Sequence, residues 1–241
     1  MKRFGLRALA EGLMGLSAVA ALGACRETPI QPVAVPDANA EIATAATTTI
    51  LSITFEGYAI GTLGAPWTIS RSRASAAQVA STGTTHGKVL VLNGSTTSGE
   101  FLIASKGLSS SASQVTSAFD IRPTAGSSFV WSFHGAGSSI GSRRIRLQRV
   151  PGSTMLVAQT VPSGSTNCGN LANDVWSRVT LVVRTATFPH TFDVRINGVA
   201  TACKGVSANI SPPFNAMNIM DASNAGYGGI VRFDNILVTT P

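Results

Sequence analysis

Residues 192–198 combine strict alternation of apolar and polar side chains with a turn signal. The apolar positions are Phe192, Val194 and Ile196, and the polar positions between them are Asp193, Arg195 and Asn197. A period of two puts these sets on opposite faces of a β-strand. The dipeptide Asn197-Gly198 follows at once and is a strong signal for a two-residue hairpin. This pattern predicts an antiparallel sheet with one face in a core.

Similar segments recur between Gly-, Ser- and Pro-containing loops along the rest of the chain. The predicted strands are Ile50–Phe55, Lys88–Leu92, Phe101–Ala104, Val115–Ile121, Ser128–Phe133, Arg143–Val150, Met155–Val161, Trp176–Thr187, His190–Ile196 and Gly229–Val238. No segment after residue 25 has a convincing helical period. The sequence therefore predicts an all-β fold, an antiparallel β-sandwich or jelly roll.

The amino terminus resembles a bacterial lipoprotein signal peptide. Lys2, Arg3 and Arg7 form a positive region, and a short, mostly apolar stretch from Gly12 to Ala21 leads to Leu22-Gly23-Ala24-Cys25. Leu followed by two small residues and Cys resembles the lipobox, which implies cleavage before Cys25 and lipidation of its thiol. An ordinary secretory signal or a membrane span is the alternative, but the apolar stretch is shorter than the roughly 20 residues that span a bilayer.

Three segments follow from this interpretation. Residues 1–24 are the signal peptide, residues 25–49 are a disordered tether rich in Pro, Ala and Thr, and residues 50–241 are the sandwich domain. The expected location is the bacterial cell envelope, with the membrane bound through the amino-terminal lipid. Arg26, which is not Asp, favours the outer membrane if the cell is Gram-negative.

The charge of the chain argues against a nucleic-acid partner. The full chain has 18 Lys and Arg against 11 Asp and Glu. Removing residues 1–24 takes away Lys2, Arg3, Arg7 and Glu11 and leaves 15 against 10, a net charge of +5. This mild excess suits acidic surface polymers but is no nucleic-acid signature.

The cysteine count predicts one disulfide. Of three cysteines, lipidation of Cys25 would leave Cys168 and Cys203 in an oxidising compartment, where thiols pair. A reactive free thiol is the alternative, but no His lies near either Cys in the sequence.

Several motifs resemble concanavalin A-like (laminin G-like) jelly-roll domains of bacterial surface proteins. These motifs are Phe55-Glu56-Gly57-Tyr58 with Pro66-Trp67 after it, the segment Ser117 to Pro123, Trp176 followed by Phe192 to Gly198, and Gly229 to Val238. The resemblance implies that the first and last strands lie side by side. It constrains activity little, because the motifs are structural.

Catalysis finds little support in the sequence, so an enzyme is the less favoured interpretation. Retaining glycosidases need two carboxylates about 5 Å apart, and no two carboxylates of the domain lie two to four positions apart on one predicted strand. The match of Gly137-Ser138-Ser139-Ile140-Gly141 to a nucleophile elbow lies in a Gly/Ser loop and is attributed to chance. The histidines His86, His134 and His190 lack metal-ligand spacing.

No cofactor is firmly predicted, although a structural Ca²⁺ is one hypothesis. Related sandwiches often hold calcium, and Glu56 and Asp234 would approach each other if the terminal strands pair. The alternative is that these carboxylates cap turns or bind backbone N–H groups.

Two sets of side chains are candidates for ligand binding. Tyr58 and Trp67 could stack on sugar rings, while Arg144, Arg146 and Arg195 could line a positive sheet face for acidic glycans. The alternatives are aromatic side chains in the core and a solvated outer face for the arginines.

These observations favour a lipid-anchored, non-catalytic envelope protein whose sandwich binds carbohydrate or another surface polymer. A structural or adhesive lipoprotein that binds other proteins is one alternative. A glycan-active hydrolase or lyase with an unrecognised site is the other. The ligand and the oligomeric state do not follow from the sequence.

Overall fold

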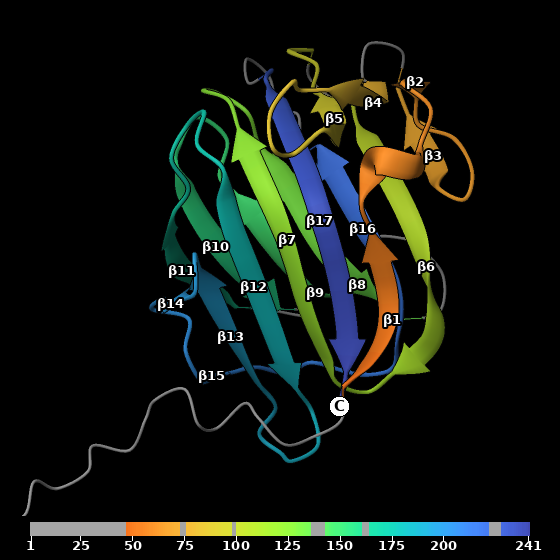
Figure 1. Cartoon of the computed structure of the whole chain (residues 1–241). Helices are drawn as coiled ribbons and strands as arrows, with labels where there is room; N and C mark the ends of the chain where they lie inside the picture. Colours follow the sequence, from red (N-terminus) through yellow and green to blue (C-terminus); the bar gives the residue numbers. More distant parts are fainter. Residues whose placement is uncertain (1–46, 73–75, 98–99, 136–142, 161–163, 222–227) are drawn as a thin grey trace, which may run out of the picture. The chain divides into compact units, whose positions relative to one another are not determined.

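The structure, a computed structural model, describes residues 47–72, 76–97, 100–135, 143–160, 164–221 and 228–241. These residues form two antiparallel sheets with a single 3-10 turn, η2 (Phe55–Gly57), and no α-helix (Figure 1). Their strands belong to one compact unit, Thr44–Pro241. The predicted signal peptide, Cys25, the tether up to residue 46 and the Gly137–Gly141 motif lie outside the described residues. No helix in the described ranges is long and apolar enough to cross a membrane.

The larger sheet has ten strands around the central pair β7 and β17. Along its main path the strands are β14 (Val199–Ala200), β13 (Thr191–Ile196), β12 (Ser177–Arg184), β7 (Val115–Pro123), β17 (Ile230–Thr240), β5 (Lys88–Asn93), β4 (Ala76–Ser81) and β2 (Gly61–Thr62). Off this path, β1 (Thr48–Ile53) pairs with β17, and β15 (Val206–Ser207) pairs with β13.

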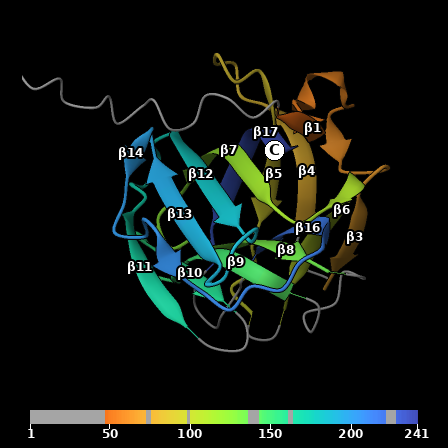
Figure 2. The ribbon, with the colours of Figure 1, turned by 90° about the horizontal axis from the view of Figure 1, so that it is seen from below.

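The smaller sheet has seven strands and lies opposite the first one (Figure 2). Its order is β11 (Ser165–Asn170), β10 (Met155–Thr160), β9 (Arg143–Arg149), β8 (Phe129–His134), β16 (Phe214–Asp221), β6 (Leu102–Ala112) and β3 (Thr68–Arg71). The predicted antiparallel sandwich is therefore confirmed.

Alternate residues of both sheets fill the space between them. On β7 and β12 every second side chain is buried, and Phe119 of β7 stacks on Trp131 of β8 with ring centroids 4.0 Å apart. Phe233 of β17 packs against both rings. Trp131 is thus a core residue, which agrees with the ordinary preference of large aromatic side chains.

The two terminal strands pair as the resemblance implied. β1 and β17 run antiparallel, with Leu51 opposite Val238 and Ile53 opposite Ile236. The hairpin at Asn197-Gly198 is also confirmed. Both residues have positive φ, 52° and 79°, which is the geometry of a type I′ turn, and Ile196 faces Val199 across it.

Cys168 and Cys203 form the predicted disulfide, with Cα atoms 5.0 Å apart. Cys168 lies within β11 of the seven-stranded sheet, and Cys203 follows β14 of the ten-stranded sheet. The bond therefore ties one sheet to the other, and both cysteines are fully buried.

Candidate functional site

The outward face of the seven-stranded sheet is unusual because its centre is buried. On β8, Phe129, Trp131 and Phe133 point into the core, so Val130, Ser132 and His134 point away from it. These three outward residues are nevertheless at most 2% exposed. The outward face of a sheet is usually exposed to solvent. The burial of these residues means that this face is covered around β8.

Strand pairing extends this surface across its neighbours. We call it the recessed face, and its described members are Val130, Ser132, His134, Arg146, Gln148, Val157, Gln159 and Asn218. Ser132 lies opposite Asn218 of β16 and opposite Arg146 of β9. Arg146 in turn lies opposite Gln159 of β10. The result is a row of polar side chains that crosses the strands at right angles.

Polar contacts organise the middle of the recessed face. The Ser132 Oγ and His134 Nε2 atoms lie 2.8 Å apart, a hydrogen-bond distance between two fully buried side chains. Asn218 is 1% exposed. These three side chains are closed to solvent, so a ligand would contact the partly exposed members of the face, Arg146, Gln148 and Gln159.

The recessed face carries positive charge only. The seven strands contain one acidic residue, Asp221, and it lies opposite Leu102 in the row of residues that faces the core. Arg146 is partly buried, and this burial lowers the pKa of its guanidinium. In the described part of the chain, Arg146 has no hydrogen bond or ion pair. The face therefore presents a cation without an internal counter-ion.

The three arginines predicted to line one positive face do not share a face. Arg146 belongs to the recessed face, and Arg144 lies two residues before it on β9, although its side chain is outside the described part. Arg195 lies on β13 of the other sheet, opposite Thr180 of β12. The prediction of a shared arginine surface is wrong for Arg195, because the sequence does not show which sheet a strand joins.

The aromatic pair Tyr58 and Trp67 lies against the core. Trp67 is 6% exposed, its ring stacks near that of Phe55, and its Nε1–H donates to the Tyr58 hydroxyl over 3.3 Å. The expectation that Trp67 offers an open ring face to a sugar is wrong. Burial of its large apolar surface outweighs exposure here.

A second polar cluster covers the outward face of the ten-stranded sheet. His86 Nδ1 lies 3.1 Å from Asp234 Oδ2, and the His86 ring stacks on Trp176 at 3.8 Å. Asp120 lies opposite Asp234 across β7 and β17 and accepts a hydrogen bond from Arg178 over 3.0 Å. Burial raises the pKa of Asp234, and the Asn235 N–H and His86 counteract the rise.

This carboxylate pair was missed by the sequence analysis, which compared carboxylates within single strands only. Its members lie more than a hundred residues apart in the chain and meet only because β7 pairs with β17. Each has a partner of its own, His86 for Asp234 and Arg178 for Asp120. The pair therefore fits a structural role better than an acid–nucleophile pair.

Calcium at Glu56 and Asp234 has no matching ligand set among the described residues. Calcium takes six to eight oxygen ligands. Here the Lys88 N–H donates to Glu56 Oε1, and the Lys88 ammonium donates to the carbonyl oxygens of Glu56 and Tyr58. No group of three or more His, Cys, Asp or Glu side chains in the described ranges is placed to hold a metal ion. The calcium hypothesis stays a prediction, and Glu56 binds a backbone N–H, as the alternative proposed.

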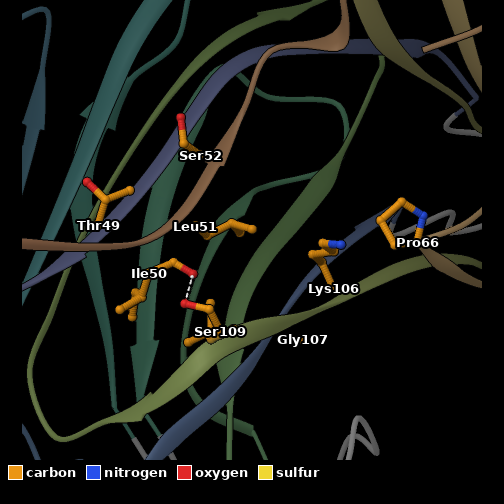
Figure 3. Close-up of a pocket in the computed structure, with 9 residues that line it drawn as sticks. Thr49, Ile50, Leu51, Ser52, Pro66, Lys106, Gly107 and Ser109 are labelled. Carbon is orange, nitrogen blue, oxygen red and sulfur yellow. Dashed lines mark hydrogen bonds between the residues drawn. The ribbon is translucent and has the colours of Figure 1, made fainter. Parts of the chain in front are cut away.

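A groove of about 570 Å³ lies between β1 and β6, where the edges of the two sheets meet. Figure 3 shows its lining, with the Ser109 hydroxyl donating to the Ile50 carbonyl oxygen over 2.9 Å. The lining combines the apolar side chains of Ile50, Leu51 and Leu108 with small polar ones, and Lys106 is its only charged member. Nothing in the structure indicates what would occupy it.

Comparison with known proteins identifies the fold but no family. No protein-family profile matches the chain, and no curated protein matches it by sequence. Among solved structures, the endo-β-1,4-glucuronan lyase from the fungus Trichoderma reesei is similar with a TM-score of 0.56 at 12% identity, over 76% of this chain and 94% of that one. The carbohydrate esterase of the Shiga toxin-encoding bacteriophage phi24B gives 0.55 at 14% identity, over 80% and 99%.

A sialidase is also similar, with a TM-score of 0.54 at 13% identity over 71% of this chain. The matched region spans only 16% of the sialidase chain. At these identities the likeness establishes the fold alone. The protein has a jelly-roll β-sandwich fold.

Proposed function

We propose that this protein binds a polysaccharide on the recessed face and does not cleave it. The observation that carries the proposal is a set of partly exposed polar side chains, Arg146, Gln148 and Gln159, on a face turned away from the core. The side-chain amides of Gln148 and Gln159 can exchange hydrogen bonds with sugar hydroxyls. The solved structures of similar fold that are named for a lyase, an esterase and a sialidase support a carbohydrate ligand by analogy only.

Binding without cleavage is favoured by the chemistry of the recessed face. The described strands place no carboxylate there, so the acid and nucleophile of a glycosidase are absent from them. The alternative role as an adhesive protein for other proteins has less support. The large exposed apolar side chains Ile60, Phe101, Val175, Phe188 and Val199 come from separate elements and loops, whereas protein interfaces are contiguous patches.

An ester hydrolase is the second candidate, favoured by the 2.8 Å contact between Ser132 and His134. A serine nucleophile needs a base within hydrogen-bond reach. Both side chains are completely buried, however, and an attacking hydroxyl must meet its substrate. Release of acetate from acetylated polysaccharide that is lost in Ser132→Ala would establish this candidate in place of simple binding.

A glycan array with the purified protein tests the proposal. We expect binding to at least one polysaccharide and a loss of about two- to tenfold in affinity for Gln148→Ala, the range for one hydrogen bond. Gln148 lies on the recessed face opposite Val130 and Val157. Thr180→Ala, on the outward face of the other sheet, is the matched control and should bind normally. Equal loss in both variants, or no binding at all, would contradict the proposal.

The same proposal places the protein in the bacterial cell envelope, tethered by lipid on Cys25. Its support is the sequence Leu22-Gly23-Ala24-Cys25 after a basic, apolar amino terminus. Cys25→Ser should abolish labelling with radioactive palmitate and release the protein from the membrane fraction. A variant that still labels and stays with the membrane would refute lipid anchoring, whatever the glycan array shows.

A further inference from the structure

We infer that Arg146 and Gln159 form a subsite for a uronic acid residue, with the sugar carboxylate on Arg146 and a neighbouring hydroxyl donating to Gln159 Oε1. The inference rests on the proposed function, because it concerns the same recessed face. It goes further by naming the chemical class of the ligand. Two independent features of the structure carry it, an unpaired cation and an unpaired acceptor side by side.

Arg146 is the first feature. Several other arginines of the domain have partners: Arg178 pairs with Asp120, Arg184 with Asp193 at 2.8 Å, and buried Arg149 donates to Thr124 O and to Ser127. Arg146 is partly buried and has no such partner in the described part of the chain. A guanidinium carries five N–H donors in a planar fork that matches a carboxylate. The missing partner is therefore an anion, and a planar one fits best.

Burial strengthens this argument. Removal of water from around Arg146 lowers the pKa of its guanidinium, and no described carboxylate on the seven strands compensates for that. An incoming anion in a partly dry recess is attracted more strongly than at an open surface, because less solvent screens the charges. Such a site discriminates between acidic and neutral sugars.

Gln159 is the second feature. It lies directly opposite Arg146 in the pairing of β9 with β10, and its Oε1 is buried without a hydrogen-bond partner among the described residues. An amide oxygen accepts hydrogen bonds only, so its partner must be an O–H or N–H donor. A buried acceptor left unpaired is unfavourable. A ligand that satisfies both groups presents a carboxylate and a hydroxyl within one strand spacing, about 4.8 Å. A uronic acid has both on one ring.

The polar row indicates how a longer ligand would lie. Ser132, Arg146, Gln159 and Ser165 follow one another on β8, β9, β10 and β11. Four strands at about 4.8 Å spacing make a row of roughly 14 Å. A polysaccharide chain that crosses the strands along this row would place one acidic residue at Arg146 and a further sugar beside exposed Ser165.

Titration calorimetry with oligogalacturonate, a neutral glucan oligosaccharide and dextran sulfate tests the inference. We expect oligogalacturonate to bind best, with an affinity that falls as salt rises because the charges are screened. Arg146→Gln should weaken oligogalacturonate binding by at least tenfold, and Gln159→Met by about threefold or more. Arg146→Lys keeps the charge but loses the fork, so it should fall between the wild type and Arg146→Gln.

Arg232→Gln on β17 is the matched control. It removes the same charge from the ten-stranded sheet, where Arg232 lies opposite Arg122, and should leave binding unchanged. Thermal melts of each variant exclude unfolding as the cause of a loss, and Arg146→Lys serves as the folded variant if Arg146→Gln does not fold.

The outcomes separate this inference from the proposed function. If Arg146→Gln binds oligogalacturonate as the wild type does, while Gln148→Ala weakens polysaccharide binding, the uronate subsite is wrong and the proposed function stands. If dextran sulfate binds as tightly as oligogalacturonate and depends equally on Arg146, the site recognises anions generally and the uronate assignment is overturned. If no polysaccharide binds, both proposals fail.

Discussion

At the scale of single residues, the direction of a side chain was easier to predict than its exposure to solvent. The alternation Ile145, Arg146, Leu147, Gln148 places Arg146 and Gln148 on the outward face, and the structure agrees, since only the apolar pair is fully buried. Whether an outward face is exposed to solvent depends on which other parts of the chain cover it, and a local sequence pattern does not show this. His134 and Asn218 were therefore missed as members of the recessed face, and Trp67 was wrongly expected to be open.

Asp193 illustrates a residue whose charge stabilises the fold. Burial by itself raises the pKa of Asp193, but hydrogen bonds from Arg184 and the Gly205 N–H, with the charges of Arg184 and Arg195, outweigh it and lower the pKa below its ordinary value. The unfolded chain therefore binds the proton more readily than the folded one. The stabilisation is present above the ordinary pKa of Asp and is lost as pH falls through the folded-state pKa.

Asp193→Asn should lower the free energy of unfolding by about 0.5–1 kcal/mol at neutral pH, a value discounted because the Arg184 side chain is 44% exposed. The deficit relative to the wild type should shrink as the pH is lowered, because the wild-type carboxylate becomes protonated. Urea unfolding at several pH values measures this. Asp174→Asn is the control, because Asp174 is exposed and Asn tolerates its positive φ of 58°. A deficit that is constant with pH would refute the ion-pair explanation.

At the scale of elements, strands with β-branched and aromatic residues were predicted, and those without them were not. β16 lies between β8 and β6 in the middle of its sheet, yet its sequence FNAMNIMD is rich in Asn, Met and Ala, which have weak strand preference. Its neighbours β8 and β6 impose the extended conformation on it. The recessed face depends on β16 for Asn218, so the centre of the candidate site was hidden for the same reason.

The hairpin between β13 and β14 gives a prediction at this scale. Gly198 has φ +79°, and a Cβ added there meets nothing within 4 Å, so any cost of Gly198→Ala is conformational. A residue with a side chain in this left-handed region costs roughly 1–2 kcal/mol. Gly107→Ala on β6 also meets nothing within 4 Å and lacks a positive φ, which makes it the control. Thermal melts should show a clear loss for the first variant only; similar melts for both would contradict the turn assignment.

At the scale of the whole molecule, the sequence predicted the class of fold but not which strands belong to which sheet. The number of strands with alternating side chains indicates a sandwich, and the motif at each end predicts that β1 pairs with β17, as observed. The division of the remaining strands between two sheets involves contacts between distant parts of the chain. Arg195 was assigned to the wrong face because its strand partners depend on that division.

The disulfide is the one covalent link between the sheets in the described part of the chain, and its removal tests how the sandwich is held together. Cys168 and Cys203 are 35 residues apart, and closing a loop of this length stabilises a fold by about 3–4 kcal/mol in the chain-entropy estimate. The double variant Cys168→Ala, Cys203→Ala should lose stability of this order in urea.

Both cysteines are fully buried, so mild reductant should act on the folded protein far more slowly than on the unfolded one. Because both cysteines belong to the core between the sheets and not to the recessed face, polysaccharide binding by the folded double variant should persist below its melting temperature. A double variant that melts like the wild type would show that packing between the sheets, without the covalent link, sets the stability of the sandwich.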